Sequence, residues 1–132
     1  MIVEARKYLG VGEFGKRELV NYYNKHCYPL IRPERKYKMS NNDDWCAMFV
    51  SVIAHKCGYP TTKFPYEVSC YQQKKMAIAN GLFTTDIKLV KPSDLILYRW
   101  KGRGVVSHVG FVESIDCGKI VTIEGNYRGT VS

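Results

Sequence analysis

The hydrophobic period of the chain changes once, and this change limits the folds that the chain can adopt. Over residues 46–57 apolar side chains recur every three or four positions, which places them on one face of an α-helix. From residue 95 onward, short runs of β-branched and aromatic residues alternate with glycine-containing turns, a pattern typical of strands. Helices followed by an antiparallel sheet predict an α+β fold, and 132 residues suffice for a single domain over 1–132.

Local signals set the boundaries of the expected elements. Asn42, Asp43 or Asp44 can cap the start of the central helix, and Gly58 ends it. The stretch 28–43 contains two prolines and a polar run, so we expect a loop there. The sequence predicts helices over residues 1–9, 13–27, 46–57 and 66–79, and strands over 95–100, 107–114 and 119–125.

The chain is basic, since 20 Lys and Arg residues against 12 Asp and Glu residues give a net charge of +8. This charge favours an anionic polymer or surface as partner, although it would also serve solubility alone. Basic clusters at 32–38 and 99–104 accompany no known nucleic-acid motif, so no nucleic-acid partner is expected. No stretch approaches the roughly 20 apolar residues of a membrane span, and the N-terminal residues lack the apolar segment of a signal peptide.

The chain has five cysteines, an odd number that cannot pair completely within one molecule. Their spacing contains no C-x-x-C and no histidine-rich companion, so we predict neither a structural zinc site nor any other metal or cofactor. Without a secretion signal, reduced thiols are expected, most of them buried as small apolar side chains. The five are Cys27, Cys46, Cys57, Cys70 and Cys117.

Cys46 differs from the other cysteines in its position on a predicted helix. It falls in the first turn, where exposed backbone N–H groups favour negative charge and lower the pKa of a thiol. The neighbouring Asp43 and Asp44 oppose this effect if they lie close to the sulfur. A thiolate is the nucleophilic form of cysteine, but Cys46 also lies on the apolar stripe of the helix. Cys46 can therefore be either a catalytic nucleophile or a thiol packed in the core.

A nucleophilic cysteine needs a base, and the chain offers three histidines. His26 ends a polar helix, where we expect it to be exposed. His55 lies nine residues beyond Cys46, which is roughly 13 Å along the helix axis and on the opposite side. His108 lies inside a predicted strand, an unusual place for an imidazole without a function, although a half-exposed strand histidine would explain it equally well. His108 is therefore the expected partner of Cys46.

The turn at 116–118 joins the last two predicted strands, and its length limits which residues face each other. For loops of about two to five residues, His108 faces a position from 124 to 128. Glu124 or Asn126 is then opposite the imidazole, where it can fix the tautomer and orientation of the ring. The other face of the hairpin is expected to carry Val109, Phe111, Val121 and Ile123 toward a core.

Several segments resemble the CHAP domain, the cysteine, histidine-dependent amidohydrolase/peptidase family. DDWCAMFVSVIAHKCGYP is similar to its nucleophile helix, and KPSDLILYRW to the strand that follows a Pro-Gly-Asp turn. SHVGFVES resembles its Gly-His-Val strand, and KIVTIEGN its Glu-Gly-Asn signature. The order and spacing also fit over about residues 43–126.

This resemblance implies a role for each matched residue. Cys46 corresponds to the nucleophile, His108 to the base, Glu124 to the orienting acid and Asn126 to a supporting polar residue. The family is similar in fold to papain-like and NlpC/P60-like enzymes, with N-terminal helices packed on an antiparallel β-sheet. Its members mostly cut bacterial peptidoglycan, as N-acetylmuramoyl-L-alanine amidases or as endopeptidases, and often occur within phage lysins. The resemblance thus implies a bacteriolytic wall hydrolase, synthesised in a host cytoplasm and acting after release or carried in the virion.

The bulk charge and three aromatic residues suggest how such a substrate could be held. Anionic wall polymers are possible partners of a chain with this charge. Trp45, Tyr98 and Trp100 are candidates to line a substrate groove, although packing in the core or at an interface is the commoner role of such residues. Two other functions remain open: a catalytically silent wall-binding module, and a cysteine amidase that acts on an amide outside peptidoglycan.

The sequence departs from the family pattern at a few positions. Ser93 and Ser107 replace glycines, which is tolerable only where the backbone does not need a positive φ. SNNDD lacks the alternating aspartates with which some relatives bind calcium, so no metal is predicted there. The family normally continues with a further strand after Glu-Gly-Asn, which NYRGTVS would begin. We therefore expect a domain that lacks its last strand or belongs to a longer lysin with a separate wall-binding domain.

Overall fold

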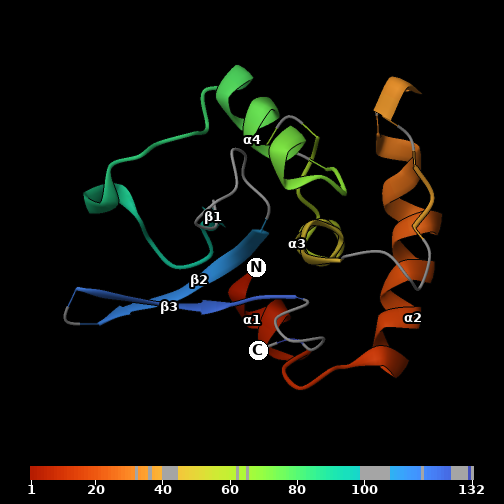
Figure 1. The fold of residues 1–132 in the computed structure, drawn as a ribbon, viewed down its shortest axis with the longest axis horizontal. Helices are drawn as coiled ribbons and strands as arrows, with labels where there is room; N and C mark the ends of the chain where they lie inside the picture. The colour runs from red at the N-terminus through yellow and green to blue at the C-terminus, as the bar shows by residue number, and fades with distance from the viewer. Residues whose placement is uncertain are drawn as a thin grey trace.

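Helices pack on a three-stranded antiparallel sheet in the computed structural model, which confirms the α+β prediction (Figure 1). The structure describes residues 1–31, 33–35, 37–39, 45–61, 63–64, 66–98, 108–116, 118–125 and 131. The helices are α1 (Ile2–Arg6), α2 (Glu13–Tyr22), α3 (Cys46–Lys56) and α4 (Cys70–Ala79), and the strands, in sheet order, are β1 (Leu95–Tyr98), β2 (His108–Asp116) and β3 (Lys119–Ile123). Within the described part of the chain, no helix has the length and apolar character needed to cross a membrane.

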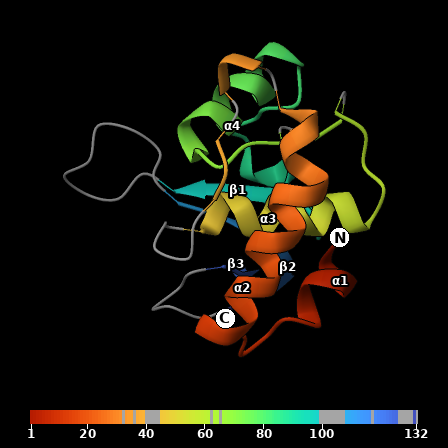
Figure 2. The ribbon, with the colours of Figure 1, turned by 90° about the vertical axis from the view of Figure 1, so that its right-hand side faces the viewer.

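Helix α3 occupies the centre of the molecule. Figure 1 shows it end-on between the sheet and α2, and Figure 2 shows α2 crossing it. All residues from Cys46 to Ala54 are buried, so the helix is covered on every side rather than on the single face that its periodicity predicts. Each large apolar side chain buried there stabilises the fold by roughly 1.5–3 kcal/mol, which makes α3 a rigid support for whatever its ends carry.

The boundaries of α3 follow its local sequence at one end and depart from the prediction at the other. Gly58 adopts a φ of +77°, and its N–H bonds to the carbonyl of His55, so the predicted glycine stop is confirmed. The N-cap position falls on Trp45, whose side chain makes no capping hydrogen bond. The predicted caps at 42–44 lie outside the described residues.

The other helices match the predicted spans with shifted ends. The predicted helix over 13–27 is present as α2 followed by a π-helical turn, Tyr23–Cys27. Helix α1 ends at Arg6 rather than at residue 9, in a turn that closes at Gly10 with a φ of +83°. Helix α4 begins at residue 70 rather than 66, because Ser69 caps it by accepting a hydrogen bond from the N–H of Gln72.

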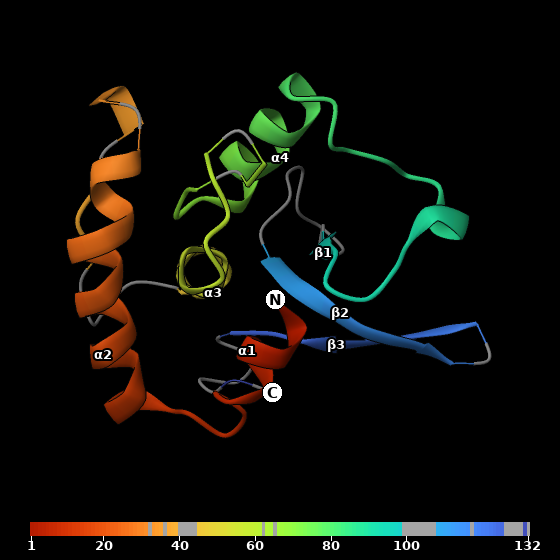
Figure 3. The same cartoon turned by 180° about the vertical axis from the view of Figure 1, so that it is seen from behind.

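A β-bulge interrupts the pairing of β2 with β3. Phe111 pairs with Ile123 and Val112 with Thr122, but the next pair is Ser114 with Val121, which leaves one extra residue in β2. Val109, Phe111 and Ile123 are buried, as predicted, whereas Val121 is 43% exposed, so its predicted core position is wrong. The reason is visible in Figure 3, where the far end of the β2–β3 hairpin extends beyond the helices that cover the rest of the sheet.

Ser93, just before β1, adopts a φ of +74°, the left-handed region that favours glycine. The backbone at this position therefore does need a positive φ, and the serine that replaces the family's glycine is strained there. The Ser93 hydroxyl accepts a hydrogen bond of 3.0 Å from the backbone N–H of Ile2, the first residue of α1. This bond offsets part of the strain and joins α1 to the start of the sheet.

Candidate active site

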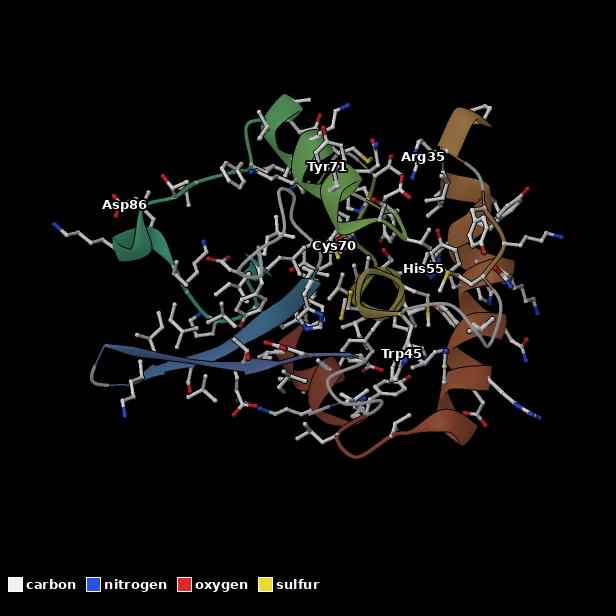
Figure 4. The ribbon with its side chains drawn as sticks, in the orientation of Figure 1. Arg35, Trp45, His55, Cys70, Tyr71 and Asp86 are labelled. Atoms are coloured by element: carbon white, nitrogen blue, oxygen red, sulfur yellow. The ribbon has the colours of Figure 1, made fainter. Side chains whose placement is uncertain are left out.

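Cys46 is the first residue of α3, so the first turn of a fully buried helix fixes the position of its sulfur. The side chain is buried, with 6% of the residue exposed. Three elements meet there: α3 itself, the start of α4, and the start of β2 at His108. Figure 4 shows Cys70, the first residue of α4, between α4 and α3 and close to this end of β2.

His108 and Glu124 form the second part of the site. His108 Nε2 lies 2.8 Å from Glu124 Oε1, and each side chain is 9% exposed. The second carboxylate oxygen accepts a hydrogen bond of 2.8 Å from the Thr122 hydroxyl. Because Nε2 is engaged by the carboxylate, Nδ1 is the ring nitrogen left for Cys46, with which His108 also forms a hydrogen bond. The structure thus brings together three of the four residues predicted for the reaction.

The contact between His108 and Glu124 is diagonal across the two strands. In the register of Phe111 with Ile123, Glu124 lies across from Gly110, two residues beyond His108. Since both side chains are on the same face, the carboxylate reaches the imidazole along the strand direction. The hairpin therefore sets Glu124 beside His108, but diagonally rather than directly opposite as the turn length predicted. Asn126 lies outside the described residues.

The electrostatics of these groups favour an ion pair. A hydrogen bond from Cys70 lowers the pKa of Cys46, burial opposes this, and His108 and the Val109 backbone lower it further, to about 5. Burial alone would lower the pKa of His108, but hydrogen bonds to Cys46 and Glu124 outweigh it and raise the pKa to about 9. Near neutral pH the pair is therefore a thiolate and an imidazolium, the arrangement that a cysteine nucleophile requires.

Glu124 remains a carboxylate despite its burial. Burial would raise its pKa, but hydrogen bonds from His108, Tyr98 and Thr122 hold it below the ordinary value. The same contacts orient Tyr98, whose ring lies 5.7 Å from the His108 ring, centroid to centroid. Tyr98 thus belongs to the site through its hydroxyl and its ring.

Cys70 is a member of the site that the sequence did not identify. Its Sγ lies 3.4 Å from Cys46 Sγ, and 7% of the residue is exposed. The other two cysteines that the structure describes are placed differently. Cys27 is buried, and burial raises its pKa to about 12, whereas Cys57 is exposed. Ser69 is the feature of the sequence that could have pointed to Cys70. A capping serine directly before Cys70 places that thiol, like Cys46, in the first turn of a helix.

Two glycines make room for the site, and no sequence pattern singled them out. A Cβ on Gly110 would lie 2.5 Å from Glu124 Cγ, so any larger residue at position 110 would displace the Glu124 side chain. A Cβ on Gly125 would lie 2.5 Å from Phe49 Cβ, so glycine lets this backbone pack directly on α3. Gly110 therefore makes room within the hairpin, and Gly125 sets how closely the hairpin packs on α3.

The aromatic residues predicted to line a substrate groove do not form one group. Trp45 is 1% exposed and belongs to the hydrophobic core, so the prediction that it lines a groove is wrong. The cause is its place directly before the buried helix, where the indole packs inward (Figure 4). Tyr98 is partly buried beside His108, and Trp100 lies outside the described residues.

The other two histidines lie together, away from Cys46. Tyr22 Oη is 2.6 Å from His55 Nδ1, and the rings of His26 and His55 stack with centroids 5.4 Å apart. His26 is half-buried in this cluster rather than exposed as predicted. The cluster joins α2 to the end of α3, so it supports the fold around the site (Figure 4).

A hollow separate from the site lies beside α4. Its volume is about 320 Å³, Arg35, Glu67 and Tyr66 line part of it, and none of the residues around Cys46 faces it. Arg35 Nε and Glu67 Oε2 form a half-buried ion pair there, at 3.0 Å. Among the described residues, no group of three or more His, Cys, Asp or Glu side chains could hold a metal ion. Residues 40–44, just before Trp45, are not among the described residues.

Comparison with known proteins gives one match. The CHAP domain model matches residues 36–126, a span that contains Cys46, Cys70, His108 and Glu124. Neither the search of curated proteins nor the search of solved structures finds a match.

Proposed function

The chain belongs to the CHAP domain family, and from this premise we propose that it hydrolyses an amide bond in the peptide part of bacterial peptidoglycan. CHAP domains are typically cysteine- and histidine-dependent amidohydrolases. The observation that carries the proposal for this chain is the group formed by Cys46, His108 and Glu124 at the start of α3 and the β2–β3 hairpin. A nucleophile, a proton carrier and an orienting carboxylate in contact are what thiol-dependent acyl transfer needs.

The reaction follows from the protonation state of the group. The Cys46 thiolate attacks the amide carbonyl, and the backbone N–H of Cys46 at the helix start is a candidate donor to the developing oxyanion. His108, as imidazolium, gives its proton to the leaving amine, which departs and leaves a thioester on Cys46. The neutral imidazole then takes a proton from water, and the hydroxide releases the acid product. Glu124 holds the ring and stabilises its positive charge through both steps.

The net charge of +8 supports an anionic wall as the working environment. Teichoic acids and similar polyanions would concentrate a basic protein at the wall surface, and salt would weaken this adsorption. The proposal extends to a lytic role, in which a phage enzyme reaches the wall after release from the host or within the virion.

Digestion of purified walls tests the proposal. The parent protein is expected to release free amino groups, and mass spectrometry of the products distinguishes an N-acetylmuramoyl-L-alanine amidase from an endopeptidase by the bond that is cut. Cys46→Ala is expected to bind walls without release. Absence of release by the folded parent would contradict the wall substrate and leave two alternatives. A catalytically silent wall-binding module would still sediment with walls. A cysteine amidase whose substrate is an amide outside peptidoglycan would not have to sediment with them.

A further inference from the structure

Two cysteines begin adjacent helices and face each other. Cys46 is the first residue of α3 and Cys70 the first residue of α4, and their sulfurs are 3.4 Å apart. That separation is a hydrogen-bond contact between a thiol and a second sulfur. Both residues are buried, at 6% and 7% exposure, so water competes little with the contact.

Gln73 holds the two helix starts in this register. It lies one turn after Cys70, is 1% exposed, and donates from Nε2 to the carbonyl of Ala47, the residue after Cys46, at 3.4 Å. The same amide group lies 3.5 Å from the hydroxyl of Ser51, one turn further along α3. The two thiols are therefore fixed by a buried polar contact between their helices.

The surroundings decide which sulfur carries the charge. Two thiolates at this separation in a buried site would repel each other strongly, so one proton stays between them. Cys46 receives hydrogen bonds from His108 and from the backbone of Val109, in addition to the field of the first turn of α3. These contacts stabilise a negative charge on Cys46, which leaves the proton on Cys70.

We propose that Cys70 is a positioning residue of the site, and that its S–H donates a hydrogen bond to the Cys46 thiolate and keeps that thiolate formed at acidic pH. This role rests on the proposed function, because it concerns the same nucleophile. It predicts a specific signature: loss of the donor raises the pH at which Cys46 becomes reactive, while reactivity at alkaline pH is retained. A role in packing alone would lower stability without moving this pH.

The test measures alkylation of Cys46 by iodoacetamide as a function of pH, with the labelled residue identified by peptide mass spectrometry. The background is Cys57→Ser, since Cys57 is exposed and would react with the reagent. Cys70→Ala removes the donor and Cys70→Ser retains an O–H donor. Cys27→Ala is the matched control, because it removes another buried thiol that contacts α3, at the carbonyl of Ser51.

In Cys70→Ala, the midpoint of Cys46 labelling is expected to rise by about one to two pH units, so labelling slows roughly tenfold at about pH 5. Cys70→Ser and Cys27→Ala are expected to keep the parent midpoint. An unchanged midpoint in a folded Cys70→Ala protein, or preferential labelling of Cys70 in the parent, would overturn the proposal. Alkylation needs no wall substrate, so a protein that fails to digest walls can still support or contradict this role.

A measurement on the parent protein covers the case in which Cys70→Ala does not fold. Isotope-labelled cysteine allows the Cβ chemical shifts of both residues to be followed during a pH titration. The Cys46 resonance is expected to change in the acidic range, while that of Cys70 remains that of a thiol. A thiolate shift at Cys70 in that range would contradict the assigned direction of the hydrogen bond.

Discussion

Gly110 lies directly under the Glu124 side chain, and a Cβ at this position would come within 2.5 Å of Glu124 Cγ. Gly110→Ala is therefore expected to push the carboxylate away from His108 and to reduce kcat by about 100-fold, since displacement of a reacting group by roughly 1 Å has that effect. The measurement is steady-state hydrolysis together with thermal unfolding.

A second glycine provides the control for this change. A Cβ on Gly15, in α2, would overlap Cγ1 of Val11, which precedes that helix and is not among the contacts of Cys46, His108 or Glu124, so Gly15→Ala also causes a local overlap. It is expected to alter stability and to leave kcat near that of the parent. Equal activity losses in the two variants would contradict a specific effect on Glu124.

Glu124→Gln removes the negative charge that stabilises the His108 imidazolium. Because the hydrogen bond to Glu124 contributes to raising the pKa of His108 to about 9, this variant should lower that pKa and reduce kcat by roughly 10²- to 10⁴-fold. The pH profile of kcat/KM reports both effects. Glu113→Gln, on the same strand as His108, breaks the 3.5 Å pair with Arg6 at the surface, and its profile should match the parent.

Activity is expected to be bell-shaped in pH. Cys46, with a pKa of about 5, loses the thiolate as the pH falls below that value. His108, with a pKa of about 9, loses the imidazolium proton as the pH rises above it. The active ion pair therefore exists between these limits, and kcat/KM should decline on both sides. A rate that rises steadily toward the pKa of an ordinary free thiol would contradict the ion pair.

Ser93 offers a test of backbone strain. Ser93→Ala keeps the positive φ and loses the hydrogen bond from Ile2 N–H, so it should destabilise the fold by about 1 kcal/mol. Ser93→Gly loses the same bond but relieves strain of about 1–2 kcal/mol, so it should be the more stable of the two variants. Urea unfolding of both measures the difference. A Ser93→Ala protein as stable as Ser93→Gly would show that the left-handed backbone carries no such cost.

Local patterns were sufficient to predict the nucleophile helix and the histidine strand. The periodicity of α3 and its glycine stop come from adjacent residues, and they correctly place Cys46 in the first turn. Hairpin geometry limits the partners of His108 to a few positions, because strand side chains alternate with a fixed period. Hairpin geometry therefore left Glu124 and Asn126 as candidate partners of His108, and the resemblance to the CHAP domain favoured Glu124.

Features that depend on long-range packing could not be predicted in this way. The contact between Cys46 and Cys70 requires the start of α4 to pack against the start of α3, and no local pattern gives the position of one helix on another. The burial of Trp45 likewise depends on which elements pack around the start of α3. The exposure of Val121 follows from how far the hairpin extends past the helices, which the alternation of side chains does not encode.

We expect Cys46 to be the residue that becomes acylated, with His108 as its proton carrier. Rapid quenching of the parent protein with a soluble peptidoglycan fragment, followed by peptide mass spectrometry, identifies the acylated residue. A thioester adduct is expected on the peptide that contains Cys46, absent in Cys46→Ala and greatly reduced in His108→Ala. Continued hydrolysis by Cys46→Ala, or an adduct on a different residue of the parent, would contradict this role of Cys46.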